Sequence, residues 1–182
     1  MPIQSLKPNV TRGEAVAAFE GGWARRWLSG RRRLRAVADA YVPFRLYEVE
    51  IANGKGGARW WFGLEAVTGT LDLYGFDSPP GGEDLVLVET RNRLEAQLEE
   101  QPARSALEDK VRRMLFQRGF FRASAPRVRA IRAVGEIHVP YWLGLYPTKG
   151  DGVRLRVLDA VRRRFEGAKA RVLFESWLTP PA

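Results

Sequence analysis

Two stretches of the chain carry apolar residues at the spacing of a helix face. In the first, Thr11 followed by Glu14 has the pattern of a capping box, which predicts a helix over residues 11–29. In the second half, Ser105 followed by Glu108 repeats that pattern and predicts a second helix start. The apolar stripes consist of Val16, Phe19, Trp23 and Trp27 in the first helix, and of Leu107, Val111, Met114, Leu115 and Phe120 in the second.

Each predicted helix is followed by a long extended stretch, over residues 34–52 and 130–147. Pro43 and Pro140 lie within these stretches. Because proline has no N–H to donate to a neighbouring strand, each is expected at a bulge, a break or an edge. After glycine-rich hairpins, second strands are predicted near 58–67 and 153–161, and third strands at Thr70–Phe76 and near 169–177.

The residues between the two helix-and-strand units are polar and broken by turns. Leu85–Val88 predicts a short strand. Glu89–Glu100 is charged and helix-favouring, and Gln101-Pro102 is expected to end that helix. We therefore expect an ordered connector with a short helix.

The two units resemble each other in sequence. Thr11–Glu50 aligns with Glu108–Pro147 at a constant shift of 97 positions without a gap. The identical pairs include Phe19 with Phe116, Val42-Pro43 with Val139-Pro140, and Leu46 with Leu143. Leu64–Val67 then matches Leu158–Val161 at a shift of 94, and the change of shift falls in the hairpin loop, where length changes are tolerated. The sequence therefore predicts a tandem duplication.

Together these elements predict an α+β fold that contains two copies of an α-β-β-β unit. We expect antiparallel meander sheets with each helix packed on one sheet face. The first repeat is predicted at residues 10–78, the connector at 79–104 and the second repeat at 105–178.

Composition narrows the function classes. The chain is 45% hydrophobic and contains no cysteine, which excludes disulfides, thiolate metal sites and cysteine nucleophiles. With a single histidine, a zinc site is not expected, and no cofactor is predicted. The N-terminus lacks the apolar core of a signal peptide, and no run approaches the roughly 18 apolar residues of a membrane span. We expect a cytoplasmic protein without a membrane span.

Residues able to do acid–base chemistry are few. His138 aligns with Tyr41, so an amphipathic filler with a polar tip is favoured over a general base. Glu65 and Asp159 occupy equivalent turn positions, where a carboxylate is expected to accept hydrogen bonds from turn amides. The glycine clusters fit hairpin turns and no phosphate-binding loop. No catalytic constellation is found, and we expect a protein that is not an enzyme.

The strands suggest a partner surface. Phe44 and Leu46 align with Tyr141 and Leu143, which predicts that this strand face is the core and that the opposite face is available. At equivalent positions of the predicted surface, one copy has an aromatic side chain where the other has an arginine. Stacking of arginine on aromatic rings is favourable. The predicted partner surface consists of Arg45, Tyr47, Trp60, Trp61, Trp142, Tyr146, Arg154 and Arg156. Two readings stay open: an interface between sheets of the chain or of two copies, and an exposed platform for a partner.

The net charge of +9 indicates an acidic partner if the charge is functional. Most of the 30 basic residues are arginine, which also fits a bias in composition and a solvated surface. The candidate basic patch consists of Arg31, Arg32, Arg33, Arg162, Arg163 and Arg164.

The Leu-Glu-Ala-Val-Thr-Gly segment at residues 64–69 resembles the strand-turn-strand corner of PepSY-like domains. That resemblance implies a small α+β module that binds rather than catalyses. We therefore expect a non-catalytic binding or scaffolding protein, whose partner is a protein or a second copy. The alternative is a nucleic-acid-associated protein that uses the arginine clusters and exposed aromatic residues.

Overall fold

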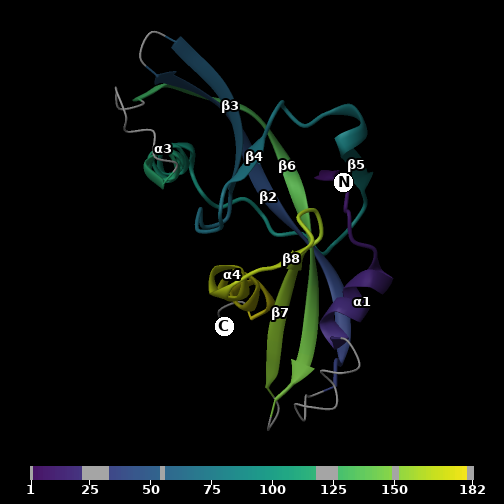
Figure 1. The fold of residues 1–182 in the computed structure, drawn as a ribbon. Helices are drawn as coiled ribbons and strands as arrows, with labels where there is room; N and C mark the ends of the chain where they lie inside the picture. The colour runs from purple at the N-terminus through teal and green to yellow at the C-terminus, as the bar shows by residue number, and fades with distance from the viewer. Residues whose placement is uncertain (1, 22–32, 54–55, 118–126, 149–151, 180–182) are drawn as a thin grey trace. The chain divides into compact units, whose positions relative to one another are not determined.

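The computed structural model describes residues 2–21, 33–53, 56–117, 127–148 and 152–179 (Figure 1). Over these residues it is a mixed α+β fold with three α-helices and one large sheet of eight strands, which confirms the predicted class. The helices are α1 (Arg12–Glu20), α3 (Glu100–Gln117) and α4 (Ala168–Leu178). The strands are β1 (Ile3–Leu6), β2 (Ala36–Asn53), β3 (Gly56–Glu65), β4 (Tyr74–Phe76), β5 (Leu85–Val88), β6 (Arg127–Pro147), β7 (Val153–Asp159) and β8 (Arg164–Phe165), and a 3-10 turn, η1, covers Gly82–Asp84.

The strand order along the sheet is β4-β3-β2-β6-β1-β5, with β7 paired to β6 and β8 paired to β7. The pairs β2–β3 and β6–β7 are antiparallel, as predicted for the two hairpins. Both long strands run through their prolines without a break, and the carbonyls of Pro43 and Pro140 accept hydrogen bonds from Ala66 and Ala160. Proline has no N–H, but its carbonyl can still accept a hydrogen bond. Each strand therefore lacks only one backbone donor at that position.

The chain divides into two compact units. Unit 1 contains Met1–Tyr41, Val86–Leu94 and Val139–Ala182, and unit 2 contains Val42–Leu85 and Glu95–His138. Both β2 and β6 pass from one unit to the other, so each unit takes segments from both predicted repeats. The compact units and the predicted repeats are thus two different divisions of the chain.

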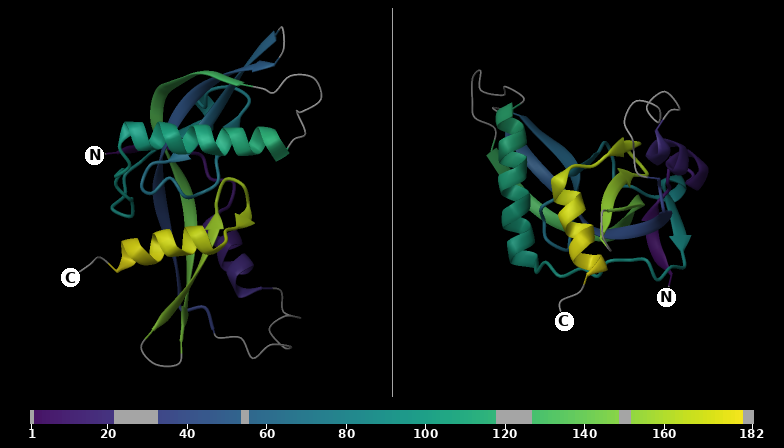
Figure 2. Two further views of the ribbon diagram at one scale, coloured as in Figure 1. Left: turned by 90° about the vertical axis from the view of Figure 1, so that its left-hand side faces the viewer. Right: turned by 90° about the horizontal axis from the view of Figure 1, so that it is seen from below.

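In unit 2, the hydrophobic core lies between α3 and the β2–β3 hairpin, and Figure 2 shows α3 lying across these strands. Leu107, Val111 and Leu115 are one helical turn apart and line the buried face of α3. The facing strand residues are Tyr47, Val49, Ile51, Phe62 and Leu64. The predicted available face of β2 is therefore also core, because α3 covers it.

In unit 1, α1 packs its buried residues Ala15 and Phe19 with Leu158 and Ala160. The capping box predicted for α1 is confirmed, since Thr11 caps the helix and Glu14 bonds back to it. The helix ends at Glu20 with Gly21 as its C-cap, and the predicted continuation over 22–29 lies outside the described residues.

The connector prediction was wrong about its helix. Residues 89–99 contain no helix, and the backbone of Tyr41 instead bonds to Asn92 and Leu94. The second helix starts at Glu100 rather than Ser105, with Pro102 in its first turn. Proline is tolerated there because the first amides of a helix have no intrahelical acceptor.

The C-terminal prediction was also wrong. The segment expected as a strand near 169–177 is helix α4, and β8 contains only Arg164 and Phe165. Ala170, Leu173 and Phe174 are buried at helical spacing, and the ring of Phe174 meets Tyr141 at 5.5 Å. The strand predicted at Thr70–Phe76 is β4, which covers only Tyr74–Phe76. Strand β1 was not predicted.

The two strand-turn corners share one hydrogen-bond pattern. Buried Glu65 accepts from the amides of Val67 and Thr68, and buried Asp159 accepts from the amides of Val161 and Arg162. This confirms the prediction that both carboxylates accept hydrogen bonds from turn amides. The fourth residue after each acid has a left-handed backbone, with φ of 70° at Gly69 and 58° at Arg163.

Candidate binding hollow on the β3–β4 hairpin

A half-open hollow of about 500 Å³ lies in unit 2, beside β3 and β4. Three separate segments form it: the middle of β3, the region of β4, and one side chain of α3. Its lining residues are Arg59, Trp60, Trp61, Phe62, Leu73, Gly75, Phe76, Asp77 and Met114. Most of the lining residues are apolar or aromatic, and one cation and one carboxylate lie among them.

The strand register explains how the aromatic side chains gather. Phe62 is buried under α3, and the half-buried ring of Trp60 lies 5.9 Å from it. Trp61 follows on the opposite strand face and is paired with Phe76 across the hairpin. The ring of Phe76 stacks at 6.0 Å on Tyr74. Two neighbouring tryptophans are thus fixed at a short hairpin with their rings only partly covered.

The charged groups of the hollow are exposed. The guanidinium of Arg59 lies 3.5 Å from Glu48, which also pairs with Arg132. Asp77 follows β4 and is exposed at the end of the hollow. A ligand in the hollow would therefore contact aromatic side chains and charged groups of both signs.

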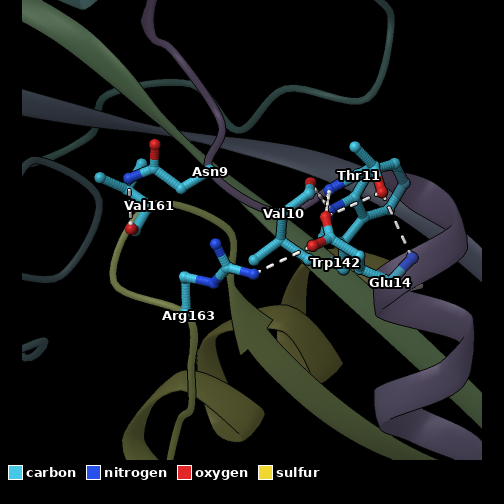
Figure 3. A network of polar contacts seen from close by, with 7 residues as sticks. All are labelled: Asn9, Val10, Thr11, Glu14, Trp142, Val161 and Arg163. Atoms are coloured by element: carbon cyan, nitrogen blue, oxygen red, sulfur yellow. Dashed lines mark hydrogen bonds and ion pairs between the residues drawn. The ribbon is translucent and has the colours of Figure 1, made fainter.

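Trp60 and Trp61 of the predicted partner surface both line the hollow, although they lie on opposite faces of β3. The structure gives other members of that surface a structural role. The indole N–H of Trp142 donates to the carbonyl of Val10 at 2.9 Å, and the hydroxyl of Tyr146 donates to the carbonyl of Phe19 at 2.7 Å (Figure 3 shows the first). Both side chains tie the N-terminal segment to β6. Arg156 stacks on Phe165 at 4.0 Å, and Arg154 is exposed.

Tyr47 was wrongly predicted as a surface residue, since only 1% of it is exposed beneath α3. Its hydroxyl and the Nη1 atom of half-buried Arg45 have no hydrogen-bond partner, although Nη2 of Arg45 donates to the carbonyl of Leu98 at 3.2 Å. Both residues lie on the strand face that α3 covers. They belong to the interior of unit 2 and not to a partner surface.

We expect Tyr47→Phe to raise the free energy of unfolding by up to about 1 kcal/mol, because it removes a buried hydroxyl without a partner. Urea denaturation measures this change. Tyr146→Phe is the matched control, since its hydroxyl is bonded, and it should lower stability by about 1 kcal/mol. A loss of stability in Tyr47→Phe as large as in the control would contradict the expectation.

Two members of the predicted basic patch are ion-paired. Arg163 bonds to Glu14 at 3.0 Å, and Arg164 bonds to Glu166 at 2.9 Å (Figure 3 shows the first pair). The backbone N–H of Thr11, then its hydroxyl, lowers the pKa of Glu14, and Arg163 adds to this effect. Arg33 is exposed, Arg162 is half-buried, and Arg31 and Arg32 lie outside the described residues.

Among the described residues, no cluster of His, Asp or Glu side chains has the grouping of a metal site. His138 is half-buried on β6. In the same part of the chain, no helix is long and apolar enough to cross a membrane.

Of the lining residues, only Trp60 and Trp61 were predicted as site residues. Sequence reasoning missed Arg59, Phe62, Leu73, Gly75, Phe76, Asp77 and Met114. Met114 was predicted only as part of the apolar stripe of its helix, and Phe76 only as part of a strand. Nothing in their spacing points to the two tryptophans, because the hairpin and α3 bring them together through the fold. Compared with known proteins, the chain matches no protein-family model, no curated protein and no solved structure.

Proposed function

We propose that the protein is a non-catalytic binding protein that takes up an apolar segment of a protein partner in the hollow beside β3 and β4. The observation that carries this proposal is the pair Trp60 and Trp61 in a half-open hollow with Phe62 and Phe76. Aromatic side chains of this kind dominate the energetics of protein interfaces. The PepSY-like resemblance of residues 64–69 stays a prediction that agrees with a binding role.

An extended peptide fits the hollow better than a compact ligand. β4 is the last strand in the order, so among the described strands none pairs with its outer edge. Gly75 and Phe76 of that edge strand also line the hollow. A peptide added along β4 gains backbone hydrogen bonds, while an apolar side chain enters the hollow.

The second candidate is a single-stranded nucleic acid. The stacked rings of Tyr74 and Phe76, together with Trp61, have the chemistry of a base-stacking platform. The cation beside them, Arg59, is paired with Glu48, and Arg163 and Arg164 are paired elsewhere in the chain. These ion pairs reduce the positive charge available for phosphates, so a protein partner is favoured.

We also propose that the chain arose by duplication of an α-β-β-β unit. In support, the unit boundaries fall after Tyr41 and after His138, which are 97 positions apart in the sequence. Buried Glu65 and Asp159 bond their turn amides in the same way. Both features are expected if one unit was copied, and they support the proposal.

The function is tested by selecting binders from a random peptide library and measuring their affinity by calorimetry. Selected peptides are expected to carry a large apolar residue, and Trp61→Ala is expected to weaken them by about tenfold or more. Trp61 is half-buried, and circular dichroism verifies that the variant is folded.

Phe116→Ala is the matched control, because Phe116 is an aromatic residue that is 57% exposed on α3 and does not line the hollow. It should leave the affinity unchanged. Peptides that bind both variants equally well would contradict the proposed site. Binding of oligothymidylate that weakens steeply with salt and depends on Trp61 would instead favour the nucleic-acid candidate.

A further inference from the structure

Met114 is the side chain that α3 contributes to the hollow. It is half-buried and lies next to buried Leu115, at the edge of the helix face that packs on the β2–β3 hairpin. Trp60, Leu73 and Met114 pack against the core of unit 2 and also line the hollow. Met114 therefore belongs both to the edge of the core and to the wall of the hollow, where a small solute that enters the hollow meets it.

Met114 also differs chemically from its neighbours. The chain contains no cysteine and two methionines, Met1 and Met114. Among the described residues that line the hollow, Met114 is the one with a sulfur atom. The thioether of methionine is a common target of oxidation, which aliphatic side chains resist. A peroxide that enters the hollow can thus react with this side chain.

Oxidation of a thioether by hydrogen peroxide needs no other reactant. A lone pair of the sulfur attacks one peroxide oxygen, so that an S–O bond forms as the O–O bond breaks. The departing hydroxide takes the proton of the transferred hydroxyl group and leaves as water. The sulfur is oxidised by two electrons, the peroxide is reduced, and the product is methionine sulfoxide.

We propose that Met114 is a site of oxidation by hydrogen peroxide, and that its sulfoxide closes the hollow to apolar ligands. Oxidation converts a flexible apolar side chain into a polar one. The sulfoxide oxygen accepts hydrogen bonds from water, so covering it with an apolar group costs free energy. The loss of ligand binding rests on the proposed function, whereas the oxidation and its effect on the packing of α3 do not.

Mass spectrometry of the full chain after treatment with dilute hydrogen peroxide tests the site itself. Met114 is expected to gain one oxygen at a rate within about tenfold of the rate in the urea-unfolded chain, because it is half-buried in the wall of a half-open hollow. A slower reaction than this would show that the fold shields the thioether, and it would overturn the proposal.

Calorimetry with the selected peptides tests the effect on the hollow. The oxidised chain should bind them about tenfold more weakly than the same chain before treatment. Met114→Leu is the matched control, because it lacks the thioether of the hollow but retains Met1 and the tryptophans. Its affinity before peroxide is compared with its affinity after peroxide, and the two should be equal. An oxidised chain that binds as tightly as before, or an equal loss in Met114→Leu, would overturn the proposal.

The midpoint of urea denaturation separates this inference from the proposed function. Peroxide should lower the midpoint of the unmodified chain and leave that of Met114→Leu where it was, because only the unmodified chain gains a sulfoxide at the edge of the core of unit 2. If no peptide binds before oxidation, the proposed function fails and the midpoint still decides the inference. A midpoint of the unmodified chain that peroxide does not change would then overturn it.

Discussion

Glu65→Ala is expected to lower the free energy of unfolding by about 3 kcal/mol. The side chain of Glu65 is fully buried, and its carboxylate accepts from the amides of Val67, Thr68 and Thr70, and from the Thr68 hydroxyl. Alanine removes the acceptor for all of these donors at once, and an unsatisfied donor costs about 1–3 kcal/mol where it is buried. Val67 is half-buried, and Thr68 and Thr70 are exposed, so not every lost hydrogen bond carries the full cost. Water that enters the vacated space offsets part of this cost. Chemical denaturation measures the change.

Two further variants make this test specific. Glu136→Ala removes an exposed carboxylate of β6 and should change stability by no more than about 0.5 kcal/mol. Glu65→Gln keeps the shape of the side chain but replaces one acceptor oxygen by a donor, so its loss should be intermediate. If Glu65→Ala were as stable as Glu136→Ala, the corner would not depend on the buried acid.

The features that the sequence predicted well are local. The capping box at Thr11 and the acids of the two corners need only residues within a few positions of each other. The long strands were also predicted correctly, because their extended patterns continue over many residues. In each case, the interaction that forms the element is contained within the segment itself.

The errors occurred where contacts between distant segments, or the assumed repeat, outweighed local pattern. Residues 89–99 favour a helix by composition, but an extended connector bonds to both backbone groups of Tyr41. In α4, the spacing of Ala170, Leu173 and Phe174 already indicated a helix, and the alignment to a strand of the first repeat concealed it.

The candidate site was predictable only in part, for the same reason. Trp60 and Trp61 are conspicuous in the sequence, but Met114 reaches the hollow only because α3 packs on the β2–β3 hairpin. Tyr47 is the opposite case, a residue predicted for the surface that the fold buries. Alternation along the strand placed it on the face opposite Phe44, and the helix that buries this face comes from the other half of the chain.

Gly144→Ala is expected to lower the free energy of unfolding by about 2–3 kcal/mol. A Cβ atom at this position would lie 2.6 Å from Cδ1 and 2.8 Å from Cγ of Phe19, well inside van der Waals contact. The ring has little room to move, because Phe19 is 2% exposed and packs edge-on against Phe165 at 5.6 Å. The carbonyl of Phe19 is also held by Tyr146.

A double-mutant cycle identifies this contact as the cause. Phe19→Leu makes a smaller side chain, so Gly144→Ala should cost at least about 1 kcal/mol less in that background than in the unmodified chain. Gly135→Ala is the matched control on the same strand, since an added Cβ there meets nothing within 4 Å, and it should be neutral or slightly stabilising. Equal costs at the two glycines, or strict additivity with Phe19→Leu, would show that the approach of α1 to β6 does not require glycine. The expected coupling would instead show that α1 packs directly on the backbone of β6, and that the absence of a side chain at Gly144 makes room for the ring of Phe19.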